Sequence, residues 1–292
     1  MRKIGLIDVD GHNGFPNLAL MKVSAHHKGL GDSVEWWNGL EHYDRVYMSK
    51  VFTFTPDIDV VINADEVIQG GTGYKDYGSL PEEIESLYPD YSIYPHFKQA
   101  IGFLTRGCVR NCPWCIVPRK EGKIHAAATW EEIKRPDSNE IVFMDNNVLA
   151  CEHGIRQLDA LTRAPVKVDF NQGLDARLID KDVAELLANV KWIRFVRLAC
   201  DSHEMIPIVE KAVKHLKAAG VPTWRLWTYA LVQDVDEAYE RVIALRKMGV
   251  EPFAQPYRDF DGGEPTAQQK RFARWCNHKA IFRTCDWKDY GN

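Results

Sequence analysis

The feature that most constrains the fold is a rhythm of short apolar runs and amphipathic segments that repeats between residues 101 and 255. Six runs have the length and composition of buried strands, at 101–104, 140–144, 165–170, 193–198, 221–229 and 251–255. Amphipathic segments with helical spacing fill the gaps, at 130–134, 154–162, 181–188, 205–219 and 235–248. Alternation of this kind predicts parallel strands covered by helices.

Polar residues follow most of these predicted strands. Because parallel strands of a barrel place their chemistry at their carboxyl ends, we expect these residues to share one rim. For any one of them, capping a loop is about as good an explanation as binding a cofactor. The rim residues are Asp145, Asn146 and Asn147 after the second strand, Asn171, Gln172 and Arg177 after the third, and Arg197 and Asp201 closing the fourth.

The first predicted strand runs into a glycine-containing loop that carries Cys108, Cys112 and Cys115. Three thiolates this close together can converge on one metal centre, and no fourth ligand lies nearby in the sequence. A structural zinc site has four ligands, and an ordinary electron-transfer cluster has four cysteines. The count of three therefore indicates an iron–sulfur cluster with one open iron. A zinc knuckle or a chance group of buried cysteines is the alternative.

The spacing Cys-x3-Cys-x2-Cys, with Trp114 before the last cysteine and a strand before the loop, resembles the motif of the radical S-adenosylmethionine enzymes. The resemblance implies a partial (β/α)6 barrel and a 4Fe-4S cluster on the three cysteines. It also implies that the open iron binds S-adenosylmethionine, which one-electron reduction cleaves to a 5′-deoxyadenosyl radical. A reductase of the flavodoxin or ferredoxin type would supply the electron.

The same resemblance suggests roles for the rim. Trp114 would pack beside the adenine, and Asp145, Asn146 and Asn147 would accept hydrogen bonds from the methionyl ammonium. Arg177 would bind the methionyl carboxylate, with Asn171 and Gln172 beside it. Arg197 and Asp201 would reach the ribose or the carboxylate. Arg106, Arg110 and Arg119 surround the cysteines, where they would steady a negative cluster or simply be solvated.

Residues 1–74 predict a small Rossmann-like domain. Apolar runs at 3–9, 33–37 and 45–51 indicate strands, 57–62 is a candidate fourth strand, and a helix is expected from residue 18 to about 29. This layer resembles the cobalamin-binding domain that precedes the radical core in one branch of the family. That branch has Asp-x-His-x-x-Gly, Ser-x-Leu and Gly-Gly, and the matching residues here are Asp10, His12, Gly14, Ser49, Val51, Gly70 and Gly71.

The match to the cobalamin branch is imperfect. Gly14 falls one position early, Val51 replaces a leucine, and the intervals are short. His12 would be an axial cobalt ligand oriented by Asp10, but a ligand loop out of register rarely keeps its geometry. Loss of the cofactor with retention of the fold is therefore favoured, and cobalamin binding is possible but not favoured.

The remaining segments complete the domain organisation. Residues 75–98, with tyrosines beside prolines, are expected to form a linker, and residues 99–260 the partial barrel. Residues 261–292 are expected to supply a lid loop at 261–264 and a helix that closes the open side of the barrel. In that helix Trp275 and the arginines would otherwise contact RNA, which the acidic chain disfavours.

Composition narrows the function class. A net charge of −4 gives no general basic field for nucleic acid. The N-terminus is expected to be neither a signal peptide nor a spanning helix, and seven cysteines suit a reducing cytoplasm. Cys151 and Cys200 would face the barrel mouth or be buried, and Cys276 and Cys285 would be structural. The sequence thus predicts a radical enzyme of unknown substrate, including a cobalamin-dependent methyltransferase or a methylthiotransferase. The alternative is a non-catalytic iron–sulfur or zinc protein.

Overall fold

The structure, a computed structural model, describes residues 1–260 and 263–291. It separates into two compact units, Met1–Gln99 and Ala100–Asn292. The lid predicted at 261–264 includes Asp261 and Gly262, which lie outside the described residues. In the described part of the chain, no helix has both the length and the apolar character needed to cross a membrane.

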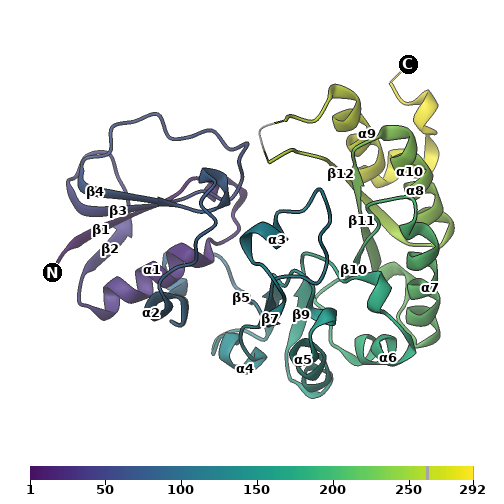
Figure 1. Cartoon of the computed structure of the whole chain (residues 1–292), viewed down its shortest axis with the longest axis horizontal. Helices are drawn as coiled ribbons and strands as arrows, with labels where there is room; N and C mark the ends of the chain where they lie inside the picture. The colour runs from purple at the N-terminus through teal and green to yellow at the C-terminus, as the bar shows by residue number, and fades with distance from the viewer. Residues whose placement is uncertain (261–262, 292) are drawn as a thin grey trace. The chain divides into compact units, whose positions relative to one another are not determined.

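The first unit is built on one parallel sheet (Figure 1). Its strand order is β2-β1-β3-β4. The chain therefore adds β2 on one side of β1 and then β3 and β4 on the other, which makes the position between β1 and β3 the topological switch point. Carboxyl ends of strands at such a switch point are where open α/β sheets usually bind ligands. The strands are β1 (Lys3–Asp8), β2 (Ser33–Trp36), β3 (Tyr43–Ser49) and β4 (Ala64–Gly70).

One sizeable helix of this unit, α1 (Leu18–Gly29), follows β1. It begins at Asn17, whose side chain accepts a hydrogen bond from the amide of Leu20, as a helix N-cap should. The strand expected at 57–62 is wrong, because the fourth strand is β4. Ile58 and Ile62 made that loop resemble a strand, but they pack from the loop against the apolar cluster on the sheet.

Residues 75–98, expected to form a linker, belong to the first compact unit. They include α2 (Glu82–Glu85), whose Ile84 is buried. The Tyr94 hydroxyl donates a 2.6 Å hydrogen bond to Asp8 at the end of β1. Asp90 accepts hydrogen bonds from Ser24 and Lys28 on α1. These polar contacts tie the segment to β1 and α1 of the same unit.

The second unit contains two three-stranded parallel sheets, β5-β8-β9 and β10-β11-β12. Parallel bridges pair Val168 with Trp192 and Leu174 with Leu198, which joins the β9 side to the β10 side. The α/β class with parallel sheets is therefore confirmed, whereas the partial barrel stays a prediction. The strands are β5 (Ala100–Gly102), β8 (Glu140–Phe143), β9 (Lys167–Phe170), β10 (Val196–Ala199), β11 (Leu226–Val232) and β12 (Glu251–Pro256).

Helices lie between the strands and cover one side of them (Figure 1). The helices are α3 (Val117–Lys120), α4 (Trp130–Ile133), α5 (Glu152–Arg163), α6 (Lys181–Asn189), α7 (Met205–Ala218) and α8 (Val235–Lys247). Side-chain caps set the starts of α4, α6 and α8, through the reciprocal Thr129–Glu132 capping box and the Asp180 and Asp234 N-caps.

The main core of this unit lies between strands and helices. Phe143 and Phe170 stack with ring centroids 5.1 Å apart, and Leu158, Leu187 and Leu216 come from three helices to the same buried cluster. Burial alternates along β8 and β10, so one face of each strand packs against helices. The opposite face of β8 and β10, and the carboxyl ends of these strands, are not covered by this packing and can carry polar groups.

The C-terminal segment forms two helices rather than the one expected, α9 (Ala267–Asn277) and α10 (Lys279–Thr284). His278 breaks the helix because its backbone is extended and its side chain caps α10. Trp275 is 1% exposed, so its indole packs in the core and does not offer a stacking surface for RNA. The Asn277 amide exchanges hydrogen bonds of 2.8 and 2.9 Å with the backbone of Ala254, which caps that edge of β12.

Candidate cluster-binding site

The cysteine loop, residues 107–124, leaves the parallel sheet after β5 and is closed at its base by two short antiparallel strands. β6 (Thr105–Arg106) pairs with β7 (His125–Ala126). Gly107 has φ +81°, and a Cβ at this position would lie 2.5 Å from the carbonyl oxygen of Lys123. Only glycine fits such a close approach of two backbones. The base of the loop is therefore held independently of any ligand.

Three consecutive residues after β8 hold the incoming arm of this loop. The Asp145 carboxylate accepts hydrogen bonds from the amides of Leu104 (3.0 Å) and Thr105 (2.6 Å). The Asn146 side chain accepts one from the amide of Gly107 (3.0 Å). The Asn147 amide nitrogen donates to the sulfur of Cys108 (3.4 Å). The loop is thus tied, residue by residue, to the neighbouring strand end.

Asp145 is the most deeply buried of these anchors, at 2% exposure. Burial raises the pKa of its carboxyl to about 6, although the hydrogen bonds from Thr105 and Leu104 act in the opposite direction. Both of its oxygens are engaged with the loop backbone. A role in binding the methionyl ammonium stays a prediction, and the structure gives Asp145 a positioning role.

Asp175, which the sequence analysis did not single out, joins three parts of the site. Its carboxylate accepts hydrogen bonds from Arg110 in the loop (3.1 Å), Asn147 after β8 (3.2 Å) and Arg177 (2.7 Å). Burial alone would raise the pKa of Asp175, but the guanidiniums of Arg177 and Arg110 hold it below its usual value. An acidic residue two positions before a rim arginine was the available signal.

The three cysteines lie close enough to influence one another electrostatically. Burial raises the pKa values of Cys112 and Cys115, and their neighbouring thiols add to the effect. The positive charge of Arg177 acts in the opposite direction on Cys112. Among the described residues, no group of three or more His, Cys, Asp or Glu is placed to hold a metal ion.

The chemistry of this donor set nevertheless suits an iron–sulfur cluster. The sulfur of Cys108 accepts hydrogen bonds from the Arg110 amide (3.3 Å) and from the Asn147 side chain, so its position is fixed by two donors. Raised thiol pKa values mean that Cys112 and Cys115 need a cationic partner to ionise. The Oδ1 atom of Asn147 is buried without a hydrogen-bond partner, an acceptor suited to a bound ammonium group. The residues present therefore fit a cluster with an amino-acid-bearing ligand.

The other rim residues divide into two groups. Arg177 and Asp201 lie near the cysteines, since both act electrostatically on Cys112. Burial raises the pKa of Asp201, whose carboxylate accepts a 3.2 Å hydrogen bond from the Leu231 amide. Arg197 instead forms a bidentate pair with Asp169 on the adjacent strand, at 2.7 and 2.6 Å.

Asn171, Gln172 and Trp114 are placed less specifically. The side chains of Asn171 and Gln172 hydrogen-bond each other at 3.3 Å, and the carbonyl of Asn171 accepts a bond from the Tyr229 hydroxyl. Trp114 is half-buried between Cys112 and Cys115. Their cofactor contacts stay predictions.

The remaining cysteines separate by burial. Cys200 and Cys276 are 0% and 1% exposed, and burial raises the pKa of each thiol to about 12. Cys200 therefore belongs to the core and not to an accessible mouth. Cys151 is half-buried at the start of α5, and the thiol of Cys285 donates to the carbonyl of Asp286 at 3.4 Å.

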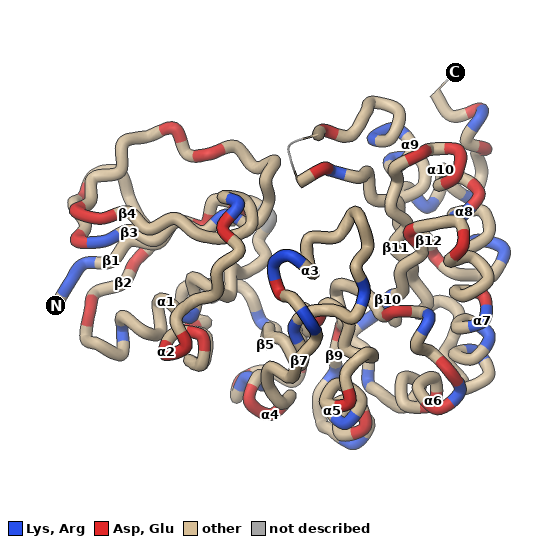
Figure 2. Tube along the Cα trace, in the orientation of Figure 1, with Lys and Arg blue, Asp and Glu red and all other residues tan. Residues whose placement is uncertain are grey.

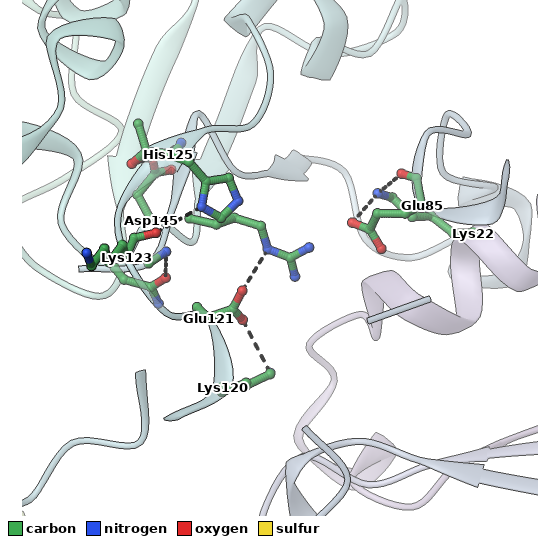
Figure 3. Close-up of polar contacts among 11 residues, drawn as sticks. Lys22, Glu85, Lys120, Glu121, Lys123, His125 and Asp145 are labelled. Atoms are coloured by element: carbon green, nitrogen blue, oxygen red, sulfur yellow. Dashed lines mark hydrogen bonds and ion pairs between the residues drawn. The ribbon is translucent and has the colours of Figure 1, made fainter. Parts of the chain in front are cut away.

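The cysteine loop is strongly basic in an acidic chain, and blue segments gather around α3 in Figure 2. Between residues 106 and 125 there are five Lys or Arg residues and one acidic residue, Glu121. The Glu121 carboxylate lies 3.0 Å from Arg106 and 3.7 Å from Lys120. Figure 3 shows Glu121 and Lys120 beside each other. One carboxylate thus serves two cations, which leaves the loop with excess positive charge.

The candidate cobalamin residues of the first unit have contacts within that unit. Asp10, 3% exposed, accepts hydrogen bonds from the Val51 amide at 2.5 Å and from the Thr55 hydroxyl. The Ser49 hydroxyl accepts from Asn17 at 2.8 Å. His12 is exposed in a short 3-10 helix.

The glycine pair of the first unit also has an internal explanation. The carbonyl of Gly70, at the end of β4, accepts a hydrogen bond from the Lys50 amide. Gly71 has φ +102°, and a Cβ there would lie 2.4 Å from the Lys50 carbonyl oxygen. The close approach that requires glycine is to the protein's own backbone. These contacts weigh against an open cobalamin loop, whose use stays a prediction.

Comparison with known proteins gives a weak but consistent result. No family model matches the sequence. The chain is similar to the ribosomal protein uS12 methylthiotransferase RimO of Clostridioides difficile (strain 630), with 25% identity over 180 residues. The match covers 56% of this chain and 37% of the relative, so the chain spans well under half of that protein's length. At a coarse level, the similarity supports a relationship with the radical S-adenosylmethionine enzymes.

Proposed function

We propose that the chain is a radical S-adenosylmethionine enzyme that holds a 4Fe-4S cluster on Cys108, Cys112 and Cys115. It reductively cleaves S-adenosylmethionine and uses the resulting radical to remove a hydrogen atom from a substrate. The observation that carries the proposal is the anchored three-cysteine loop, with a buried, unpartnered acceptor on Asn147 beside Cys108.

When bound, the reduced cluster supplies the electron that breaks the sulfonium carbon–sulfur bond of S-adenosylmethionine. The chain's own residues position the reactants. Asn147 keeps an acceptor free for an ammonium group while its nitrogen holds Cys108 and Asp175. Arg177, held by Asp175, presents a guanidinium suited to a carboxylate. The partly exposed loop would receive its electron from a reductase of the flavodoxin or ferredoxin type.

A second candidate is a more specific reaction, methylthiolation, which the similarity to a methylthiotransferase favours. That relative acts on a ribosomal protein by its name, and this chain's substrate is a separate question because most of the relative's length is unmatched. A non-catalytic iron–sulfur or zinc protein is the alternative from a different class.

Anaerobic reconstitution with iron and sulfide tests the proposal. A radical enzyme becomes brown, changes its spectrum on addition of S-adenosylmethionine, and yields 5′-deoxyadenosine when dithionite is added. A colourless protein that retains one zinc contradicts it. A stable cluster that leaves S-adenosylmethionine intact favours the redox sensor instead. Mass spectrometry of candidate peptides after turnover, searching for an added methylthio group, separates methylthiolation from other outcomes.

A further inference from the structure

Helix α8 carries a buried arginine that reaches the carboxyl ends of two strands. Arg241 is 1% exposed. Its Nη1 atom donates a 2.7 Å hydrogen bond to the carbonyl of Cys200, directly after β10. Its Nη2 atom donates one of 2.7 Å to the carbonyl of Leu231, near the end of β11. Arginine is almost never fully buried unless it is paired, and here the partners are main-chain carbonyls at the rim.

The two carbonyls mark the place where β10 ends beside β11. At the end of β10, the Cys200 amide donates a 2.8 Å hydrogen bond to the carbonyl of Tyr229. Because β11 continues past this point, the amide and carbonyl of Leu231 need partners other than β10. The Asp201 carboxylate accepts a hydrogen bond from that amide at 3.2 Å, and Arg241 donates to that carbonyl. These two side chains therefore complete the ladder, and Arg241 also holds the residue before Asp201.

A second residue of α8 holds the same segment. Glu237, one turn before Arg241, accepts a 2.8 Å hydrogen bond from the amide of His203. Its carboxylate also lies 3.8 Å from Nε of Arg241. The segment 200–203 is thus attached to one helix at both ends, and Asp201 lies between the two attachments. The position of Asp201 is therefore determined by α8 as well as by β11.

Asp201 lies near the cysteine loop, since its charge acts on Cys112 and Cys115. The Leu231 amide bonds to its Oδ1 atom, and Oδ2 accepts no hydrogen bond within the described part of the chain. Burial raises the pKa of Asp201, whereas the Leu231 amide and the charge of Arg241 act in the opposite direction. Oδ2 is therefore an acceptor for a donor group of a ligand bound at the cysteines.

We propose that Arg241 is a positioning residue for S-adenosylmethionine: by holding Cys200 and Leu231, it fixes the carboxylate of Asp201 in the orientation that accepts a hydrogen bond from the ligand. This inference rests on the proposed function, because it requires the ligand at the cysteines. Arg241 does not touch the ligand and acts through Asp201. A lysine at this position would keep the charge, but its ammonium group lacks the planar fork that spans two carbonyls.

A double-mutant cycle tests whether Arg241 acts through Asp201. Arg241→Lys, Asp201→Asn and the double variant are reconstituted, and the Kd for S-adenosylmethionine is measured by equilibrium binding. We expect each single variant to bind about tenfold more weakly, and the double variant also about tenfold, because both changes remove one interaction. The iron content should stay at the wild-type level. Wild-type affinity in Arg241→Lys would overturn the proposal, as would an additive loss of about 100-fold in the double variant.

Arg246→Lys is the matched control for a merely structural role. Arg246 is also on α8 and also donates to two backbone carbonyls, those of Phe282 (2.9 Å) and Arg283 (3.2 Å). Loss of this fork should lower the Tm as Arg241→Lys does, yet leave the Kd for S-adenosylmethionine unchanged. Equal weakening in the two lysine variants would show that affinity follows stability alone, which would overturn the positioning role.

Hydrogen exchange in the full chain without a cluster gives a readout that needs no ligand. The Leu231 amide, whose acceptor is Asp201, should exchange about tenfold faster in Arg241→Lys and at the wild-type rate in Arg246→Lys. Unchanged exchange in Arg241→Lys would overturn the proposal. Failure of wild-type protein to bind S-adenosylmethionine would instead defeat the proposed function, and the exchange comparison would still decide whether Arg241 holds Asp201.

A second variant covers the case in which Arg241→Lys does not fold. Glu237→Gln keeps Arg241 and weakens only the neighbouring attachment of His203. We expect it to bind S-adenosylmethionine about threefold more weakly, because the segment that carries Asp201 is then held less firmly. Wild-type affinity in Glu237→Gln would overturn the proposal in that case.

Discussion

The two units place polar residues at the carboxyl ends of parallel strands and use them differently. In the first unit, Asp10 bonds to the loop after β3 and Ser49 to the N-cap residue of α1, and Gly71 lets the backbone approach Lys50 closely. In the second unit, side chains of Asp145, Asn146 and Asn147 form hydrogen bonds with the cysteine loop, which carries three thiols. The same architecture therefore has a strand end whose polar groups bond within their own unit in one case, and a strand end that anchors a loop with three thiols in the other. The difference lies in where the hydrogen bonds are directed.

The difference between the two units depends most on the three thiols of the second. Cys112→Ala should remove most of the iron and reduce 5′-deoxyadenosine formation by at least about 100-fold, because loss of a ligand exceeds the usual cost of losing a supporting contact. Iron analysis and product chromatography measure both effects. Cys285→Ala, which changes a half-buried cysteine in the tail, is the matched control and should leave both unchanged. Cleavage retained in Cys112→Ala would contradict the ligand assignment.

Asp145 gives a pH-dependent test of the anchor. Its folded pKa near 6 lies above the ordinary 3.8, so the folded protein binds more protons than the unfolded chain between these values. Stability contributed at this position is therefore highest below about pH 4 and falls as pH rises through 6, by up to about 3 kcal/mol. Urea unfolding of wild type and Asp145→Asn at pH 4 and pH 7 measures it. The wild type should lose stability relative to the variant, and parallel pH profiles would show that Asp145 is not buried as described.

A smaller effect is expected at Asp175, which joins the cysteine loop to two strand ends. Asp175→Asn should keep the iron content but weaken S-adenosylmethionine binding about tenfold, because Arg177 and Arg110 lose their shared charged acceptor. Equilibrium binding to the reconstituted protein measures the change. Asp159→Asn, which removes an exposed arginine pair on α5, is the control. Equal affinities in the two variants would remove Asp175 from the site.

The smallest effect is expected in the first unit. His12→Ala should leave stability and cluster chemistry unchanged, and a cobalamin titration should give the same spectrum with either protein, because Asp10 is engaged with Val51 and Thr55. A spectral shift that appears with wild type and disappears in His12→Ala would show that this strand end binds cobalamin after all.

Elements whose structure follows from hydrophobic periodicity could be predicted from the sequence. The helix expected at 181–188 is α6, and the strand expected at 140–144 is β8, because both have a clear apolar face. The prediction failed at 57–62, where Ile58 and Ile62 cover a sheet from a loop. Local pattern cannot distinguish an apolar residue in a strand from one that packs onto a strand.

The site shows a similar division. The cysteines and the 145–147 run could be selected from spacing and strand position. The hydrogen bonds from the amides of Leu104, Thr105 and Gly107 to this run could not be predicted, because they join residues about 40 positions apart in the sequence. Asp175 was missed for the same reason: its importance comes from the Arg110, Asn147 and Arg177 side chains that converge on it.

The two-residue ladder at the base of the cysteine loop also bears on how such a protein can change. Because β6 and β7 bring the two ends of the loop together, the segment between them can change in length or sequence without moving β5 or β8. Substitution would be restricted at Gly107, where no side chain fits, and free at exposed positions such as Val109. The loop is therefore a transplantable module, and a designer could graft it onto another parallel sheet that supplies an Asp-Asn-Asn run at the adjacent strand end.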